Sequence, residues 1–410
     1  MDLRLGAHYD ELRERVREFA RANWPLRGAE AELPRREQEI LFRRRAIEAG
    51  LLARTVPRAY GGAEVPTDPI AEAVIRQELD AAGAPHRASP QGTHMLVPTL
   101  LEEGSEAQKR HYIPPTLVGE IYWCQGYSEP GAGSDLASLQ SRAVAHGDHF
   151  VITGQKIWTS NAFEADMMFG LFRTEADEPR SGGLSYLLVD MKSPGIDVRP
   201  LRQMNGGEEF CEVFFDEVRV PIENLVGRRG EGWKVSKATL KHERMLIGDA
   251  SYARIHFQNL LDLARRVRHG GRPAIEDPGI RRRLAELEGW IACQVHASQR
   301  ILSAVARNED LEVLPDMLMA KLNSTNVFQR MTRMALDLLG EEALTEPSPD
   351  ETGMAVGTPT PGRWVSQAMV AIGTAIAGGT SNIQRNIIGE RVLGLPRDPR
   401  PPGSAGGART

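Results

Sequence analysis

The spacing of apolar residues changes twice along this chain, and the two changes divide it into three segments. Up to about residue 115, apolar side chains such as Leu12 and Val16 recur at helical spacing. From residue 121 to residue 220 the apolar runs are short and β-rich, with turn residues between them. After Pro221 the helical spacing returns. The sequence therefore predicts helices, then a β module, then a long helical segment.

Five stretches of the middle segment are typical of strands, and they suggest a small antiparallel barrel or sandwich. They are HFVITG (149–154), MMFGLFR (167–173), LSYLLVDM (184–191), IDVRPL (196–201) and EVFFDEVRV (212–220). Four long helical patterns follow, at 233–267, 280–308, 314–340 and 366–393. Long helices joined by short connections favour an antiparallel bundle.

The predicted fold class is therefore α+β, with three domains. An N-terminal helical domain is expected over 1–118, a middle antiparallel β-barrel or sandwich over 119–225, and a C-terminal four-helix bundle over 226–396. The last residues, 397–410, are rich in proline and glycine and are expected to form a disordered tail.

Composition excludes several classes of protein. A net charge of −5 without a clustered basic face argues against a nucleic-acid partner. The three cysteines are scattered, so neither a disulfide framework nor a zinc site is expected. This cysteine content predicts a cytoplasmic protein. His242-Glu243 lacks a second histidine one turn later, where Leu246 stands, which argues against a zinc-protease motif. No membrane span or signal peptide is predicted.

Two motifs lie in the β module, YSEPGAGSD (Tyr127–Asp135) and GQKIWTSN (Gly154–Asn161). A glycine-rich turn lets backbone N–H groups approach an anion such as a phosphate. Trp158 offers a flat face to a flat ligand. A planar ring joined to a phosphate would fit both motifs. Each motif alone would be better explained as an ordinary turn or a core tryptophan, and GAGSDL is not a dinucleotide fingerprint.

A third motif, GGTSNIQRNIIGERVLGLPR (Gly378–Arg397), lies in the last helical segment. In this order and in these segments, the three motifs resemble the acyl-CoA dehydrogenase family of flavoenzymes. The resemblance covers nearly the whole chain, from residue 1 to about residue 396.

The resemblance implies FAD as the cofactor. It implies that Ser128 and the backbone at Tyr127 meet the flavin ring, that Trp158 lies against it, and that Ser160 donates a hydrogen bond near N5. The residues that it assigns to FAD are Tyr127, Ser128, Gly133, Ser134, Trp158, Ser160, Gly379, Thr380, Ser381 and Asn382. Of these, Gly133 and Ser134 are expected near the pyrophosphate.

The family's reaction removes the α-proton of an acyl-CoA with a carboxylate, while hydride leaves Cβ for flavin N5. Many members carry the base just before the Gly-Thr-Ser of the third motif, where this chain has Gly378. A second arrangement in the family uses a Glu-Arg pair on the first bundle helix, which here is Glu243-Arg244. Glu243 is therefore the expected base, and Arg244 is expected to anchor the substrate site. The competing interpretation of Glu243 is a surface carboxylate.

A further departure concerns assembly. Many members use an Arg-x-x-Phe segment between the first two bundle helices to hold the FAD of a neighbouring subunit, but here only Arg272 of that pattern is present. Such departures also occur in branches built from two unlike subunits. A homo- or hetero-oligomer, dimer or tetramer, is therefore expected.

The leading interpretation is a FAD-dependent acyl-CoA dehydrogenase that passes electrons to an electron-transfer flavoprotein. The substrate is an acyl-CoA or an acyl-carrier thioester, and Gly378 suits a branched, ring-bearing or dicarboxylic acyl chain. One alternative is a flavin-dependent monooxygenase on the same fold. The non-enzyme alternative is a partner subunit of a hetero-oligomeric acyl-CoA dehydrogenase.

Overall fold

The chain divides into two units by its internal contacts. The computed structural model describes residues 6–178, 181–247, 250–306, 315–352 and 360–396. The first unit spans Met1–Leu246 and the second spans Ile247–Thr410. The first unit holds the predicted helical and β segments, together with most of the first long helix that follows them.

The helices of the first unit precede and follow its β module. They are α1 (Ala7–Asn23), α2 (Arg35–Glu48), α3 (Pro69–Ala81), α4 (Val97–Glu103), α5 (Glu106–Val118) and α6 (Gly232–Ile247). Asp68 caps α3 by accepting hydrogen bonds from two backbone N–H groups, and Pro69 follows at the first helical position. Ser105 and Gln108 form a capping box at the start of α5.

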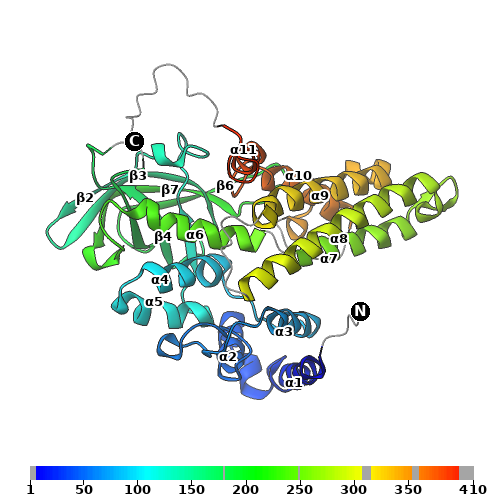
Figure 1. Cartoon of the computed structure of the whole chain (residues 1–410), viewed down its shortest axis with the longest axis horizontal. Helices are drawn as coiled ribbons and strands as arrows, with labels where there is room; N and C mark the ends of the chain where they lie inside the picture. The colour runs from blue at the N-terminus through cyan, green and yellow to red at the C-terminus, as the bar shows by residue number, and fades with distance from the viewer. Residues whose placement is uncertain (1–5, 179–180, 248–249, 307–314, 353–359, 397–410) are drawn as a thin grey trace. The chain divides into compact units, whose positions relative to one another are not determined.

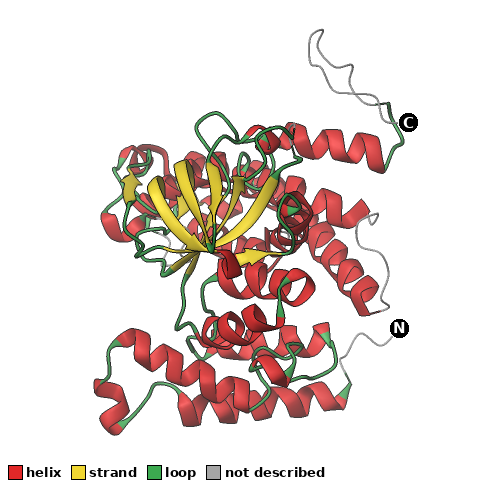
Figure 2. Ribbon diagram, turned by 90° about the vertical axis from the view of Figure 1, so that its left-hand side faces the viewer, coloured by secondary structure: helices red, strands yellow, loops and turns green. Residues whose placement is uncertain are grey.

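A single mixed sheet forms the β module, and its strands fan out in Figure 2. The strands are β1 (Trp123–Gly126), β2 (Arg142–His146), β3 (His149–Ser160), β4 (Met167–Arg173), β5 (Leu184–Asp190), β6 (Ile196–Leu201), β7 (Phe210–Pro221) and β8 (Leu225–Val226). Their order is β6-β7-β3-β2-β4-β5-β8, with β1 paired to β4. Most pairs are antiparallel, as predicted. The exceptions are β1 and β2, which both run parallel to β4.

Both faces of β4 are buried, which explains its continuous apolar sequence. Phe169 and Leu171 belong to one hydrophobic cluster, together with side chains of α4 and α5. Met168 and Phe172 belong to a second cluster, formed with side chains of β3 and β7. Figure 1 shows α4 and α5 lying beside the sheet. The helices therefore cover one face of the sheet, and the strands themselves enclose the other.

The second unit is helical and is organised around one central helix. Its helices are α7 (Ala250–Arg266), α8 (Pro278–Ala306), α9 (Pro315–Leu339), α10 (Pro361–Thr374) and α11 (Ser381–Arg391). The helices α7, α8, α10 and α11 all contact α9. The residues Leu260, Leu287, Met331 and Trp364 lie in their shared core. A short hairpin, β9 (Arg268–His269) with β10 (Arg272–Pro273), joins α7 to α8.

The predicted α+β class and the order of helical, β and helical segments are confirmed. The pattern at 233–267 corresponds to α6 and α7, and residues 248–249 between them lie outside the described part. The pattern at 366–393 corresponds to α10 and α11. The predicted disordered tail also lies outside the described residues, and the predicted domain boundaries stay predictions. No helix within the described residues has the length and apolarity needed to cross a membrane.

Candidate active site

The first motif forms a tight loop directly after β1. The backbone groups of Glu129 and Ala132 exchange two hydrogen bonds of 3.0 Å, which closes the turn. Tyr127 is buried at the base of this loop, Ser128 is partly buried, and Ser134 is exposed. The loop therefore presents its second half to the surroundings while its first half is fixed in the core.

The glycines of this loop leave open space. A Cβ atom added at Gly131 or at Gly133 would meet no heavy atom within 4 Å. Neither glycine has a positive φ, so backbone strain does not require glycine there. The space beside them is thus open to a ligand that approaches the backbone closely.

The second motif ends β3 with a bulge. The register of β3 against β7 shifts between Lys156 and Thr159. Trp158, within the bulge, has a left-handed φ of 60°, and its side chain is 58% exposed. Its ring meets Phe210 edge-to-face at 6.0 Å. Left-handed backbone at a non-glycine residue is costly and concentrates at functional sites. The bulge therefore holds a large aromatic surface outside the core.

A buried ion pair joins the two motifs. The ammonium of Lys156 lies 2.8 Å from a carboxylate oxygen of Glu129, and it donates to the carbonyl of Tyr127 at 3.2 Å. The carboxylate also accepts from the backbone N–H groups of Gln140 at 2.5 Å and Ser141 at 2.9 Å. The side chains of Lys156 and Glu129 are 0% and 6% exposed. The ion pair therefore fixes the first and second motifs relative to each other.

The charges of this pair are kept by their mutual contacts. Burial alone would raise the pKa of Glu129, but Lys156 and the backbone donors together hold that pKa below its ordinary value. Burial lowers the pKa of Lys156 to about 8, and the charge of Glu129 opposes that shift. Around neutral pH the pair is ionic, and neither partner is free to act as a base.

A cavity of about 500 Å³ opens beside this junction. Its walls include Pro130 and Gly131 from the first motif, Gly154 and Gln155 from the second, and Arg142 from β2. Residues of both motifs thus border this cavity within the first unit, and none of these lining residues is a predicted FAD contact.

The third motif forms the turn between α10 and α11 in the second unit. Gly378 and Gly379 have left-handed φ angles of 60° and 91°. The buried ammonium of Lys321 on α9 donates to the carbonyls of Ala375 at 3.0 Å and Gly379 at 2.7 Å. Gln384 donates to the carbonyl of Gly378 at 3.1 Å. Side chains from two helices therefore fix the shape of this turn.

The turn leads directly into α11. Thr380 caps this helix by accepting from the N–H of Ile383 at 3.3 Å. Asn382 is exposed in the first turn, and its side-chain oxygen accepts from Arg385 at 3.3 Å. The predicted contacts Gly379, Thr380 and Asn382 thus lie together.

Replacing Gly379 by alanine is expected to destabilise the protein by about 1–3 kcal/mol, because left-handed backbone is strained for any other residue. The new Cβ would also lie 2.7 Å from Nε2 of Gln384, which would have to move. Gly373→Ala on α10 is the matched control, since a Cβ there meets nothing within 4 Å. Thermal unfolding of both variants checks this, and equal transition temperatures would contradict it.

Glu243 and Arg244 lie on α6. Their side chains are outside the described part of the structure, but the helix around them is described. Val235 and Thr239 are buried, with 1% and 0% exposure. Residues four apart on a helix lie on the same face. Glu243 therefore follows Thr239 on the face of α6 that is buried one turn earlier.

Comparisons with known proteins agree with this arrangement. Models of the N-terminal, middle and C-terminal domains of acyl-CoA dehydrogenase match residues 7–120, 124–218 and 230–393. Acyl-CoA dehydrogenase IpdE1 of Mycobacterium tuberculosis is 37% identical over 95% of this chain and 98% of its own length. This chain belongs to the acyl-CoA dehydrogenase family, whose members are oxidoreductases that act on acyl-CoA and depend on FAD.

Solved structures support the same family. The ChsE4-ChsE5 complex from Mycobacterium tuberculosis includes a chain that is 26% identical, with a TM-score of 0.77 over 97% of this chain and 100% of that one. A chain of the Tcur3481-Tcur3483 steroid ACAD is 29% identical over the same shares of both chains, with a TM-score of 0.77. Both resemblances extend over nearly the full length, so the fold is shared as a whole.

Three buried charged residues that fix the shape of individual motifs are not among the predicted site residues. Glu129 lies inside the first motif and Lys156 lies inside the second. The signal for Lys156 is its position on the inward side of β3, in line with buried Phe150 and Ile152. Lys321 is buried on the apolar face of α9, where a lysine is unusual.

Proposed function

We propose that this chain catalyses FAD-dependent α,β-dehydrogenation of an acyl-CoA thioester, with Glu243 as the base that takes the α-proton. The observation that carries the proposal is the position of Glu243 on α6, on the face that is buried at Thr239 and Val235. A carboxylate on a buried helix face is more often functional than a carboxylate on a solvated face.

The backbone at the alternative base position supports Glu243 further. Gly378 has no side chain, and its left-handed φ of 60° would strain a glutamate placed there. The carboxylate needed to remove the α-proton must therefore come from another element. Glu129 of the first motif is committed to Lys156, and we assign the role of base to Glu243. In this proposal Arg244 anchors the substrate site beside it.

The proposed cofactor is FAD, which accepts the hydride from Cβ of the acyl chain when it is bound. The open space at Gly133 and the exposed ring of Trp158 support this choice, because one fits a phosphate and the other a flat ring. We infer that Ser134 binds the pyrophosphate, that Ser128 and the backbone at Tyr127 meet the ring, and that Ser160 donates near N5. Gly379, Thr380 and Asn382 complete the proposed contacts.

The proposed acyl group is bulky. A glycine in place of glutamate at position 378 removes a large side chain from the turn, and one relative at 29% identity is described as a steroid ACAD. We infer a ring-bearing or branched acyl chain rather than a short linear one. Bleaching of the enzyme by such a thioester but not by butyryl-CoA is the expected result.

The proposed electron acceptor is an electron-transfer flavoprotein.

For assembly, we favour a hetero-oligomer, because one relative of known structure is a complex of two proteins, ChsE4 and ChsE5. Gel filtration and light scattering of the chain alone, and after mixing with a second subunit, distinguish this from a homo-oligomer. A partner subunit without flavin is the second candidate function, and a colourless purified protein would favour it.

Replacing Ser134 by alanine is expected to weaken FAD binding roughly 10- to 100-fold, since a hydrogen bond to a charged phosphate contributes about 1.5–3 kcal/mol. The readout is the flavin-to-protein ratio after gel filtration, together with FAD titration of the apoprotein. Ser193→Ala, in the turn after β5, is the matched control. Undiminished FAD retention by Ser134→Ala would remove Ser134 from the pyrophosphate site.

A further inference from the structure

Three buried hydroxyl groups meet where α6 packs on the rest of the first unit. The hydroxyl oxygens of Thr99 on α4 and Thr239 on α6 are 3.0 Å apart. A hydrogen bond of 3.3 Å joins Thr239 to the hydroxyl of Tyr186 on β5. The three residues are 0% exposed. A helix, a second helix and a strand are thus joined by a chain of hydroxyl contacts.

These hydroxyls are not required to fill the core. Thr99 also donates to the carbonyl of Met95 at 2.7 Å, and Thr239 lies 3.3 Å from the carbonyl of Val235 on its own helix. Each threonine thus has a partner four residues earlier in the chain, so the contacts between elements are additional. Valine has nearly the same shape as threonine but lacks the hydroxyl, so the two residues differ here in their polar contacts alone. The hydrogen bonds between these hydroxyls therefore impose a specific relative orientation on the elements, which non-directional apolar contacts do not.

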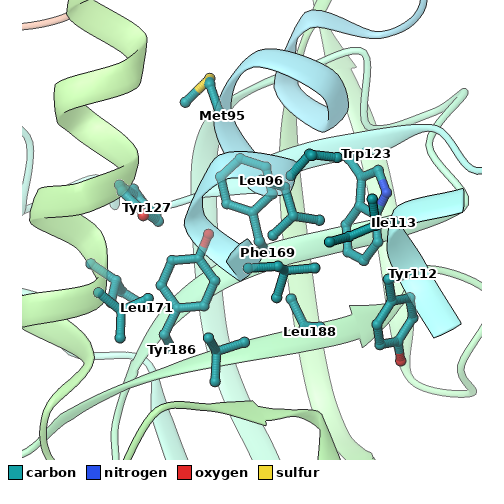
Figure 3. Close-up of a cluster of buried hydrophobic side chains, with 14 of the residues drawn as sticks. Met95, Leu96, Tyr112, Ile113, Trp123, Tyr127, Phe169, Leu171, Tyr186 and Leu188 are labelled. Carbon is teal, nitrogen blue, oxygen red and sulfur yellow. The ribbon is translucent and has the colours of Figure 1, made fainter. Parts of the chain in front are cut away.

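The same group is connected to the first motif. The rings of Tyr186 and Tyr127 meet edge-to-face at 6.3 Å, and Phe169 stacks on Tyr186 at 6.0 Å. Figure 3 shows Tyr127, Phe169 and Tyr186 gathered in one cluster. Burial raises the pKa of Tyr186, so its hydroxyl keeps its proton. Tyr186 therefore links Thr239 to the loop that the proposed flavin site uses.

We propose that the hydroxyls of Thr99, Thr239 and Tyr186 are a positioning device that fixes the rotation of α6, and that Thr239 acts on the reaction through Glu243. This inference rests on the proposed function, because it needs Glu243 to be the base. Thr239 is a positioning residue here and does not touch the substrate.

The geometry of a helix explains why rotation matters. Glu243 follows Thr239 by four residues, which is about 6 Å along the axis and about 40° around it. Side-chain atoms lie about 5–6 Å from the axis, so turning the helix by about 10° moves them by about 1 Å. A misplacement of about 1 Å can lower a rate roughly 10²-fold. Fixing α6 at Thr239 therefore controls the position of the base one turn later.

Thr239→Val tests the proposal, because it removes the hydroxyl and keeps the shape. The rate constant of flavin reduction by acyl-CoA is expected to fall about 10- to 100-fold, with the FAD content and the Kd for acyl-CoA changed less than about twofold. Amide hydrogen exchange within α6 is expected to become faster, which is a readout independent of activity. Thr332→Val on α9 is the control, since its hydroxyl bonds only carbonyls of its own helix.

The decisive comparison uses the Glu243→Gln background. If Thr239 acts through the base, Thr239→Val lowers the residual rate of that variant no further. An equal fall in both backgrounds overturns the proposal, as does an unchanged rate in Thr239→Val. If Glu243→Gln alone leaves the rate unchanged, the proposed function fails instead. Should Thr239→Val fail to fold, Tyr186→Phe removes the other end of the chain of hydroxyls and carries the same expectations.

Discussion

Replacing Glu243 by glutamine is expected to lower the rate constant of flavin reduction by acyl-CoA roughly 10²–10⁴-fold, the usual contribution of a general base. Glutamine keeps the size and polarity of the side chain but cannot accept the α-proton. Binding of FAD and of acyl-CoA is expected to persist, since neither depends on that proton transfer. Anaerobic stopped-flow absorbance, with bound FAD measured in the same sample, separates these effects.

The matched control for this experiment is Glu231→Gln, just before α6. Glu231 is exposed, and its substitution is expected to leave the reduction rate within about twofold. Full activity in Glu243→Gln would contradict the assignment of Glu243 as the base and favour its interpretation as a surface carboxylate. Loss of FAD from that variant would also contradict the assignment, because it would give Glu243 a structural role instead.

Replacing Lys156 by methionine is expected to destabilise the first unit by about 3–5 kcal/mol, the usual result of removing one partner from a buried ion pair. Methionine has a similar length, so the loss is mainly electrostatic. The carboxylate of Glu129 would stay buried with only its two backbone donors. Loss of FAD retention is expected to accompany this change, because the pair holds the two motifs together. Urea denaturation and flavin content measure the two effects.

The pH dependence of this loss has a definite sign. In the natural protein the pKa of Glu129 is lowered, so its contribution to stability is present above about pH 4.5 and is lost as the pH falls. Without Lys156, burial dominates and raises the pKa of Glu129, so the variant gains relative stability as the pH falls. The difference in stability is therefore expected to shrink between about pH 7 and about pH 5.

Two further variants make this test specific. Lys192→Met removes an exposed lysine that lies 3.3 Å from Asp166, and a change within about 1 kcal/mol is expected. Glu129→Gln combined with Lys156→Met is expected to cost less than the sum of the single changes, because no unpaired charge remains. Additive losses, or a difference that grows as the pH falls, would show that the pair does not act as a unit.

Much of the fold could be predicted because the alternation of buried residues is local information. The runs at β4 and β5 are mostly apolar, and the structure buries most of their residues on both faces. The parallel pairing of β1 with β4 could not be predicted, since their partners are separated by 44 residues in register. Pairing at that distance depends on which faces the helices cover, and sequence spacing does not encode that.

The sequence motifs of the candidate site could be predicted, but the contacts between their residues could not. The resemblance implies that Ser128 and Trp158 both lie at the flavin ring, and in the structure the N–H of Ile157 donates to the carbonyl of Ser128 at 2.9 Å. The left-handed backbone of Trp158 carries no sequence signal, because the bulge arises from the register of β3 against β7. The ion pair was missed for a similar reason. A charged residue within a β pattern is usually assigned to the solvent face, although Lys156 alternates in phase with the apolar Phe150 and Ile152. The fold shows that its side chain is buried.

Anaerobic mixing of the purified protein with a panel of acyl-CoA thioesters, short linear, branched and ring-bearing, tests the proposed function most directly. We expect the protein to retain FAD and its oxidised-flavin absorbance to bleach fastest with a bulky thioester. The same experiment with Glu243→Gln is expected to leave the absorbance nearly unchanged on that time scale. Bound FAD that no thioester bleaches in the wild-type protein would contradict dehydrogenation and favour an oxygen-dependent reaction or a missing subunit.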